Sequence, residues 1–315
     1  MKRFTGSNEN NPREHRCGFV ALIGRPNVGK SSLMNLFLRE KVGIVSAVPQ
    51  TTRHQIRGVV HLDKERAQIV MVDTPGIHSF RDPLVAHLNT VAHHSLEGCD
   101  LALYVADANR RVGREETNVL KFLAAQSLPV IMVLNKIDLS EKYVEEYLEA
   151  WRKFAGEDSF RSRLKYVIPF SAKTGFHFGE LKSAIVECLP VHPPFYGPEA
   201  KTDFPLPLRL AEVLREKLLM LLSQEIPHAL AVLIEDIREE DRLVRVRATI
   251  YVRTASQKKI VVGKNGHVLK TAGGQARKEM AEIVGKKVFL STWVKVLKEW
   301  PEKIRILRQL GYWWM

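Results

Sequence analysis

Cysteine is scarce in this 315-residue chain, which holds only Cys17, Cys99 and Cys188. Their wide spacing, with no C-x-x-C pair, argues against a disulfide framework or a zinc site and is typical of a reducing compartment. The chain also lacks an apolar run long enough to cross a membrane, and residues 1–16 lack the apolar stretch of a secretory signal. We therefore expect a cytoplasmic protein whose residues 1–16 form a disordered tail.

Acidic residues are in the minority. The sequence has 48 Lys and Arg against 35 Asp and Glu, which gives a formal net charge of +13. Residues 201–315 alone carry 22 Lys and Arg against 13 Asp and Glu, whereas the part before them is close to balanced. A basic C-terminal part favours a polyanionic partner, although a solubilising surface has the same composition.

Apolar runs alternate with helical patterns between residues 17 and 188, and each run is predicted to be a buried strand. The runs are Phe19–Ile23, Gln68–Val72, Leu101–Val105, Val130–Leu134 and Tyr166–Phe170. This alternation predicts an α/β domain with a doubly wound, mostly parallel sheet, whose ligand binds at the carboxyl ends of the strands. Clustered prolines indicate a semi-rigid linker over residues 189–207. A smaller α+β domain is predicted over residues 208–315.

Residues 24–31 read G-R-P-N-V-G-K-S, the pattern of a phosphate-binding loop. A predicted strand precedes the loop and an apolar-periodic helix follows it, so that backbone N–H groups can surround a polyphosphate at a helix N-terminus. Lys30 then reaches the outer phosphates, and the Ser31 hydroxyl can ligate Mg²⁺. The predicted contacts of this loop are Gly24, Asn27, Val28, Gly29, Lys30, Ser31 and Ser32.

The segment Asp73-Thr74-Pro75-Gly76 follows the second predicted strand. A carboxylate at that strand tip can hold Mg²⁺ through a bound water, and the Gly76 N–H can approach a γ-phosphate. The segment alone could be a simple turn. Beside a phosphate loop on a neighbouring strand, it predicts the metal-binding side of the same site.

Two further segments follow strands and are suited to select a base. The ionised side chain of Asp138 only accepts hydrogen bonds, and guanine presents two adjacent donors where adenine has no such pair. Asn135 can bond the purine N7, and the Ala172 N–H can donate to the guanine carbonyl. The predicted base-binding residues are Asn135, Lys136, Asp138, Ser171, Ala172 and Lys173.

The second domain contains a G-x-x-G loop, Gly263–Gly266, in a basic surrounding. Two glycines let the main chain approach a nucleic-acid backbone closely, while Lys264 neutralises phosphate charge. We expect Phe289 and Trp293, on a strand downstream, to lie in the core. The predicted RNA contacts are Lys258, Lys259, Gly263, Lys264, Asn265, Gly266, Lys270 and Arg277.

With these motifs in order, the N-terminal part resembles the translation-factor-like GTPases. By that resemblance the segment Gln50-Thr51-Thr52-Arg53 is the G2 element, and Thr52 rather than Thr51 closes on Mg²⁺ and the γ-phosphate. Ile77 stands where many small GTPases carry a water-orienting glutamine, which predicts a low intrinsic rate of hydrolysis.

Asn27 resembles an asparagine with which related GTPases hold a potassium ion beside the phosphates. Such a cation would neutralise charge that develops in the transition state. The alternative is that Asn27 only stabilises the turn of the loop. The resemblance implies catalytic roles for Asn27, Lys30, Thr52 and Gly76.

The G-x-x-G domain resembles a type II KH domain, and the whole chain over residues 17–313 is similar to the Era family of bacterial ribosome-assembly GTPases. The motifs that carry this resemblance are Q-T-T-R, D-T-P-G, V-V-G-x-x-G, W-V-K-V at 293–296 and the closing L-G-Y at 310–312. It implies a monomeric RNA-binding GTPase, with no DNA partner, that binds near the 3′ end of small-subunit ribosomal RNA and acts in maturation of that subunit. It also implies peripheral association with the inner membrane.

Two alternatives from other classes stay open. In one, the chain is a nucleotide-gated RNA-binding scaffold in which hydrolysis is incidental, as the apolar Ile77 suggests. In the other, the basic face binds anionic lipid, although the C-terminal segment 302–310 is short for an amphipathic membrane helix.

Overall fold

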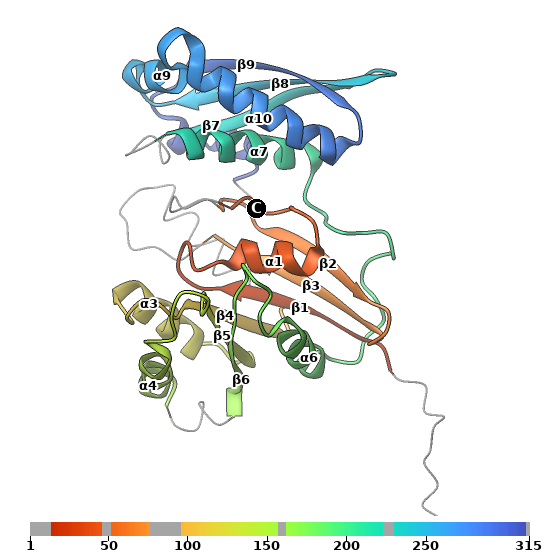
Figure 1. Ribbon diagram of the computed structural model, residues 1–315, viewed down its shortest axis with the longest axis vertical. Coiled ribbons are helices and arrows are strands. Elements are labelled where there is room, and N and C mark those ends of the chain that lie inside the picture. The colour runs from red at the N-terminus through yellow and green to blue at the C-terminus, as the bar shows by residue number, and fades with distance from the viewer. Residues whose placement is uncertain (1–13, 46–51, 76–95, 157–161, 223–229, 313–315) are drawn as a thin grey trace, which may run out of the picture.

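The computed structural model describes residues 14–45, 52–75, 96–156, 162–222 and 230–312. Two layered units lie one above the other along the long axis of the molecule (Figure 1). The lower unit is built on a six-stranded sheet and the upper unit on a three-stranded sheet. This arrangement confirms the predicted fold class, an α/β domain followed by an α+β domain.

The six-stranded sheet has the strand order β2-β3-β1-β4-β5-β6. Its strands are β1 (Arg16–Ile23), β2 (Ile56–Leu62), β3 (Ala67–Asp73), β4 (Leu101–Asp107), β5 (Val130–Asn135) and β6 (Leu164–Pro169). All neighbours are parallel except β2 and β3, which pair antiparallel. The edge strand β2 is not among the predicted strands, because Arg57, Gly58 and His61 interrupt its apolar residues.

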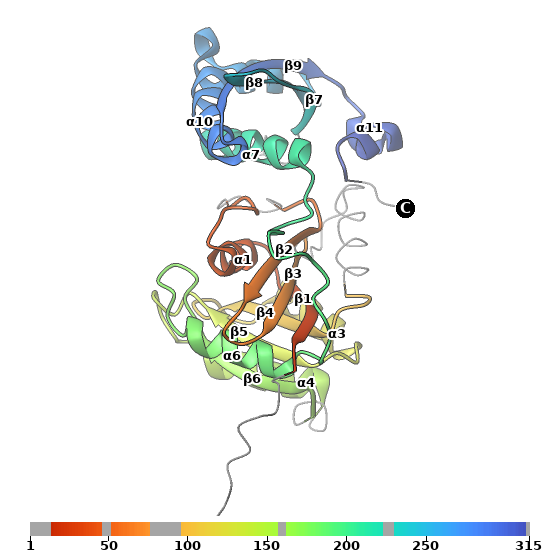
Figure 2. The same ribbon diagram turned by 90° about the vertical axis from the view of Figure 1, so that its right-hand side faces the viewer.

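Helices cover both faces of this sheet, and α1 and α3 lie on opposite sides of it (Figure 2). The helices are α1 (Lys30–Leu38), α3 (Arg114–Ala124), α4 (Val144–Ala155) and α6 (Phe178–Cys188). In β1, Leu22 belongs to the core cluster with α1 and α6, and Ile23 to the cluster with α3 and α4. A strand buried on both faces is a continuous apolar run, which is why the sequence reveals the parallel strands.

The proline-rich segment between the two units is fastened to the first sheet. Val59 N–H on β2 donates to the Lys201 carbonyl over 2.8 Å. The side-chain oxygen of Gln68 accepts from the backbone N–H groups of Phe195 and Tyr196 over 2.8 and 3.1 Å. Because proline offers no N–H, these few bonds to other residues hold the segment in place.

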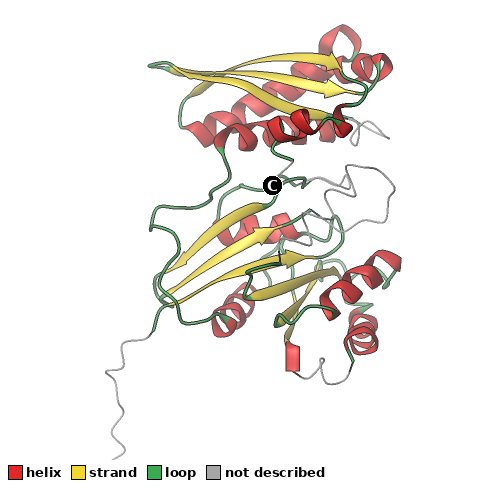
Figure 3. Ribbon diagram, turned by 180° about the vertical axis from the view of Figure 1, so that it is seen from behind, coloured by secondary structure: helices red, strands yellow, loops and turns green. Residues whose placement is uncertain are grey.

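The second unit stacks its long helices on one face of the sheet β7-β8-β9, as seen from behind in Figure 3. β7 and β8 pair antiparallel, and β8 and β9 pair parallel. The elements are α7 (Leu206–Leu221), β7 (Ala231–Glu239), β8 (Leu243–Val252), α9 (Ala255–Val262), α10 (His267–Val284), β9 (Lys287–Val296) and α11 (Ile304–Gln309), with short 3-10 turns η1 (Lys264–Gly266) and η2 (Trp300–Glu302). None of the helices in the described ranges is both long enough and apolar enough to cross a membrane.

The prediction that Phe289 and Trp293 lie in the core is wrong. Both side chains are about half exposed, at 51% and 52%, whereas Val288 and Val294 on the same strand are buried. Long helices cover only one face of the three-stranded sheet, so alternate residues of β9 point to opposite environments. On the outer face the Arg245 guanidinium lies 5.2 Å from the centre of the Phe289 ring.

Candidate nucleotide site and KH loop

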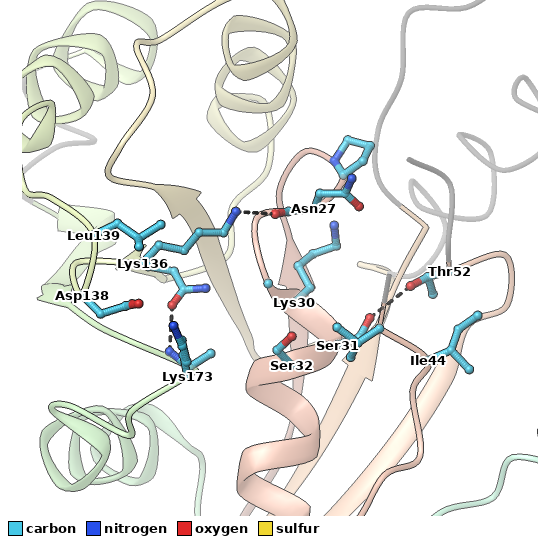
Figure 4. A pocket seen from close by; sticks show the side chains of 15 residues that line it. Asn27, Lys30, Ser31, Ser32, Ile44, Thr52, Lys136, Asp138, Leu139 and Lys173 are labelled. Carbon is cyan, nitrogen blue, oxygen red and sulfur yellow. Dashed lines mark hydrogen bonds between the residues drawn. The ribbon is translucent and has the colours of Figure 1, made fainter. Parts of the chain in front are cut away.

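A pocket of about 440 Å³ lies at the carboxyl ends of the strands of the first sheet. The phosphate loop follows β1 and Asn135 ends β5, and both contribute to the lining (Figure 4). Predicted site residues in its wall are Asn27, Gly29, Lys30, Ser31, Ser32, Thr52, Asn135, Lys136, Asp138, Ala172 and Lys173. The parallel topology thus brings together segments that are about 145 positions apart in the sequence, as expected for such a sheet.

Two glycines let the phosphate loop pass close to its neighbours. At Gly29, φ is +106°, and a Cβ there would come within 2.2 Å of Asn135 Nδ2. At Gly24 a Cβ would come within 2.2 Å of the Val105 carbonyl oxygen. Larger residues at these two positions would displace the loop from β4 and β5, and α1 begins directly after Gly29.

Lys30 is buried, and its ammonium group lies inside the curl of the loop. Nζ donates to the carbonyl oxygens of Gly24 and Arg25 over 2.9 and 3.0 Å. Burial lowers the pKa of Lys30 to about 8, against the opposing attraction of the Asp73 carboxylate. A polyphosphate in the loop would supply the negative charge that favours the ammonium form.

Three oxygen-bearing side chains meet beside Lys30. Ser31 Oγ donates to Asp73 Oδ2 over 2.5 Å and lies 3.1 Å from Thr52 Oγ1. The other carboxylate oxygen of Asp73 is buried and has no hydrogen-bond partner within the described residues, and burial raises the pKa of Asp73. Hydroxyl and carboxylate oxygens, with one acceptor left open for a metal-bound water, fit Mg²⁺.

Asn135 joins the phosphate loop to the segment that the sequence predicts to bind the base. Its Nδ2 donates to the Val28 carbonyl over 2.7 Å, and its Oδ1 accepts from the Ala172 N–H over 2.9 Å. From the sequence, we expect the Asn135 side chain to bond N7 of the purine and the Ala172 N–H to bond its carbonyl. Here the two groups bond each other, so Asn135 fixes the distance between two binding segments.

The proposed base-selecting carboxylate is oriented by a neighbour. Ser171 Oγ donates to Asp138 Oδ1 over 2.6 Å, and Asp138 lies at the rim of the pocket (Figure 4). Lys136 Nζ crosses the pocket to donate to the Asn27 carbonyl over 2.8 Å and to Asp107 over 2.8 Å. The stem of Lys136 therefore lies along the wall where a base would stack.

A charged network that is not among the predicted site residues lies behind the loop. Glu116 on α3 is buried and accepts from Arg25 Nε over 2.6 Å and from Tyr104 Oη over 2.7 Å. Asp107, which ends β4, accepts from Lys136. Asp107 could have been found as a carboxylate at the tip of a parallel strand, but nothing in the sequence around Glu116 marks it.

Some predicted site residues lie outside the described residues. These are Gly76, Thr51 and the Ile77 that replaces a glutamine. Their proposed roles stay predictions from the sequence.

The G-x-x-G loop connects α9 to α10 in the second unit. A capping box of Thr254 and Gln257 starts α9. Gly263 and Gly266 have φ of +75° and +74°, and a Cβ at Gly263 would come within 2.9 Å of the Val268 backbone nitrogen. Any other residue at either position would have to adopt a strained backbone conformation, so the turn favours glycine at both.

Basic side chains of α9, of the loop and of α10 are exposed to solvent. Within the described ranges none of them forms an ion pair, in contrast to the paired cations elsewhere in the same domain. They are Lys258, Lys259, Lys264, Lys270 and Arg277. A group of exposed cations around a glycine turn can hold a phosphate backbone.

The fold and the two sites define a GTPase that carries a C-terminal KH domain. Residues 19–136 match the family model of the 50S ribosome-binding GTPases, and residues 225–301 match that of the KH domain. GTPase Era of Caldanaerobacter subterraneus subsp. tengcongensis is 44% identical over 300 residues, which cover 95% of this chain and 98% of that protein. GTPase Era of Staphylococcus haemolyticus is 39% identical, with 95% and 98% covered. The chain belongs to the Era family of GTPases.

Solved structures agree with this assignment. Era in complex with MgGDPNP and nucleotides 1506–1542 of 16S ribosomal RNA superposes with a TM-score of 0.86 at 35% identity, covering 95% of this chain and 99% of that one. A point variant of Aquifex aeolicus Era bound to GDP·AlF4⁻ superposes with a TM-score of 0.85 at 34% identity, covering 94% and 99%. This protein is therefore an enzyme that hydrolyses GTP.

Proposed function

We propose that this GTPase binds small-subunit ribosomal RNA near its 3′ end through the KH loop and switches that interaction by GTP hydrolysis during maturation of the small subunit. The main support for this proposal is the exposed basic surface around Gly263–Gly266. The same chain has a nucleotide pocket lined by residues of the phosphate loop and of the predicted base-binding segments. The Era structure with 16S ribosomal RNA, 35% identical to this chain, supports it.

In the proposed site, Lys30 holds the outer phosphates, and backbone N–H groups of the loop hold the inner ones. Ser31, Thr52 and Asp73 hold Mg²⁺, which when bound neutralises phosphate charge. Asp138 accepts from guanine, and the stem of Lys136 covers the ring. The backbone N–H of Gly76 is proposed to approach the γ-phosphate from the sequence alone.

Three finer points belong to the same proposal. Asn27 is proposed to hold a potassium ion. The chain is proposed to act as a cytoplasmic monomer, and sedimentation at several concentrations tests that state. Peripheral association with the inner membrane rests on the family resemblance, and flotation with anionic liposomes tests it.

The RNA interface is tested with an RNA that matches nucleotides 1506–1542 of 16S ribosomal RNA, by fluorescence anisotropy over a salt series. Changing Lys264 and Asn265 together to aspartate places negative charge against the phosphates and should abolish binding at moderate salt. Lys264→Ala should weaken binding modestly and lower the salt slope by about one contact. The control is Lys142→Asp, an exposed lysine of the GTPase domain.

Wild-type affinity in the double-aspartate variant would mean that the basic half binds RNA elsewhere. GTP hydrolysis without RNA should persist in that variant, because the nucleotide pocket lies in the other domain. Multiple-turnover hydrolysis with and without RNA separates the switch from a scaffold with incidental hydrolysis. A rate that RNA leaves unchanged would favour the scaffold.

A further inference from the structure

Residues before, at the end of and after the G2 segment are bonded to the second domain. Lys41 and Val45 stand before the segment, Arg53 is its last residue, and His54 follows it. All four contact α7, α10 or residues near the C-terminal end. The intervening residues 46–51 lie outside the described ranges.

Arg53 is buried, at 1% exposure, although it follows a residue of the nucleotide pocket. Its Nη1 donates to the Leu230 carbonyl over 2.8 Å and lies 3.5 Å from Tyr312 Oη. The guanidinium also lies 5.6 Å from the centre of the Tyr312 ring and 5.9 Å from that of Trp300. The carbonyl and the two aromatic rings hold the guanidinium in this position. If Arg53 moved away from them, its buried positive charge would lose these favourable interactions.

His54 is also buried between the domains, at 2% exposure. Its Nδ1–H donates to the Gly311 carbonyl over 3.1 Å, and its ring centre is 4.9 Å from that of Tyr312. Gly311 has φ of +68°, and a Cβ there would come within 3.2 Å of His54 Cε1. Gly311 and Tyr312 of the closing L-G-Y motif thus form the binding site for the His54 ring, which we call the His54 socket.

Glu216 of α7 bonds the residues that precede the G2 segment. Its carboxylate is 1% exposed and accepts from the Val45 N–H over 2.9 Å and from Lys41 Nζ over 2.5 Å. Lys41 also pairs with Glu279 on α10 over 2.9 Å. The same helix α10 begins at the G-x-x-G loop, so one rigid element connects the RNA-binding turn to the segment before G2.

We propose that Arg53, His54 and Glu216 are positioning residues through which the KH domain sets the wall of the nucleotide site. Arg53 and His54 act on the adjoining Thr52, and Glu216 acts on Val45, which also lines the pocket. Thr52 Oγ1 lies 3.1 Å from Ser31 Oγ, and Thr52 is covalently joined to the buried Arg53. A shift of the KH domain by about one ångström therefore moves Thr52 relative to the oxygens of Ser31 and Asp73, a displacement large enough to change hydrolysis substantially.

This coupling does not run through the proline-rich linker. Residues 189–207 are bonded to the edge of the GTPase sheet through Val59 and Gln68, and none of them lines the nucleotide pocket. The contacts of Arg53, His54 and Glu216 instead run directly between the pocket side and the KH domain. By linkage, an RNA that moves the KH domain must change the affinity for a GTP analogue by the same factor that the analogue changes RNA affinity.

The test uses the full chain with Glu216→Ala, because Glu216 belongs to the KH domain and, among the residues that the structure describes, reaches the wall of the nucleotide pocket only through the Val45 N–H. We expect kcat for GTP hydrolysis without RNA to fall about tenfold, with KM and the affinity for GDP within about twofold of wild type. Glu216→Gln retains an acceptor for the Val45 N–H and should give an intermediate kcat. The control is Arg57→Ala, which removes an exposed pair with Asp203 of the linker and should leave kcat unchanged.

A wild-type kcat in Glu216→Ala would overturn the proposal. So would a fall in GDP affinity equal to the fall in kcat, because it would mean general damage to the domain. If the alanine variant does not fold, kcat and GDP affinity of the glutamine variant are compared with those of wild type instead.

The RNA arm of the experiment rests on the proposed function. In wild type, RNA affinity should differ between the GDPNP and GDP complexes, and Glu216→Ala should bring that ratio close to one. An unchanged ratio would contradict the coupling. Absence of RNA binding in wild type would instead remove the proposed RNA function, while the kcat comparison would still decide the role of Glu216.

Discussion

The Glu116 carboxylate accepts a 2.6 Å hydrogen bond from Arg25, so α3 reaches the back of the phosphate loop. Glu116 also accepts from Tyr104 over 2.7 Å, and burial raises its pKa. The carbonyl of Arg25 in turn accepts from Lys30. The loop is therefore shaped from behind by a buried ion pair as well as from within by its glycines.

Replacing Glu116 with glutamine should destabilise the GTPase domain by about 3 kcal/mol, because it removes the nearer counter-charge of the largely buried Arg25 guanidinium and leaves only the Asp107 carboxylate, 3.8 Å away. GDP affinity should fall as well, since the carbonyl of Arg25 helps to place Lys30. Chemical denaturation and GDP titration measure the two effects. Asn118→Ala on the exposed side of α3 serves as control, and equal stabilities of the two variants would contradict the role of the pair.

Guanine selection should depend on Asp138. In Asp138→Asn a donor faces the two guanine donors, so GTP affinity should fall by about 3 kcal/mol, roughly a hundredfold in Kd. Xanthosine triphosphate, which presents a carbonyl there, should become the preferred nucleotide. Competition binding with both nucleotides measures the change. An unaltered preference for GTP would remove Asp138 from base selection.

Much of the nucleotide site was predictable because its residues follow buried parallel strands. Lys30, Asp73 and Asn135 each stand at the end of such a strand or shortly after it, and apolar runs mark the strands clearly. The topology then brings their side chains to one edge without further information. The same reasoning extends to Asp107 at the end of β4.

The parts that were not predicted depend on partners far away in the sequence. Arg53 finds Tyr312 at a separation of 259 residues, and no local pattern distinguishes it from an exposed arginine of a polar loop. Phe289 and Trp293 have the composition of core residues. Their exposure follows only from the helices lying on one face of a three-stranded sheet.

Potassium should accelerate hydrolysis more than sodium if Asn27 holds a cation beside the phosphates. The Asn27 carbonyl is fixed by Lys136, and its backbone has φ of +61°, so the loop position is defined before any ligand binds. Asn27→Ala should make the rates in the two salts equal. Asn27→Asp is a matched comparison that keeps an oxygen ligand. Equal rates in wild type would leave Asn27 as a residue of the loop turn.

The interface between the domains should weaken at acidic pH through His54. Burial lowers its pKa to about 4, and the cations of Arg215 and Arg53 act in the same direction. Glu212, whose Oε1 lies 3.7 Å from Nε2, favours protonation, but this carboxylate is already bonded to Arg215 over 2.5 Å. The Gly311 carbonyl fixes the proton on Nδ1. The neutral form is therefore the one that fits the His54 socket.

The free energy of unfolding should fall as the pH falls, because between the two pKa values the unfolded chain binds more protons at His54 than the folded chain does. Above the unfolded pKa of about 6.5, His54 does not lower the free energy of unfolding. The loss begins there and grows as the pH falls towards 4. At pH 5 His54 lowers the free energy of unfolding by about 2 kcal/mol.

His54→Asn keeps a donor for the Gly311 carbonyl. Between pH 7 and pH 5, the free energy of unfolding of this variant should fall by about 2 kcal/mol less than that of wild type. His267→Asn, an exposed histidine of the KH domain, should follow the wild-type pH curve. Parallel curves for wild type and His54→Asn in chemical denaturation would show that His54 keeps an ordinary pKa in the fold.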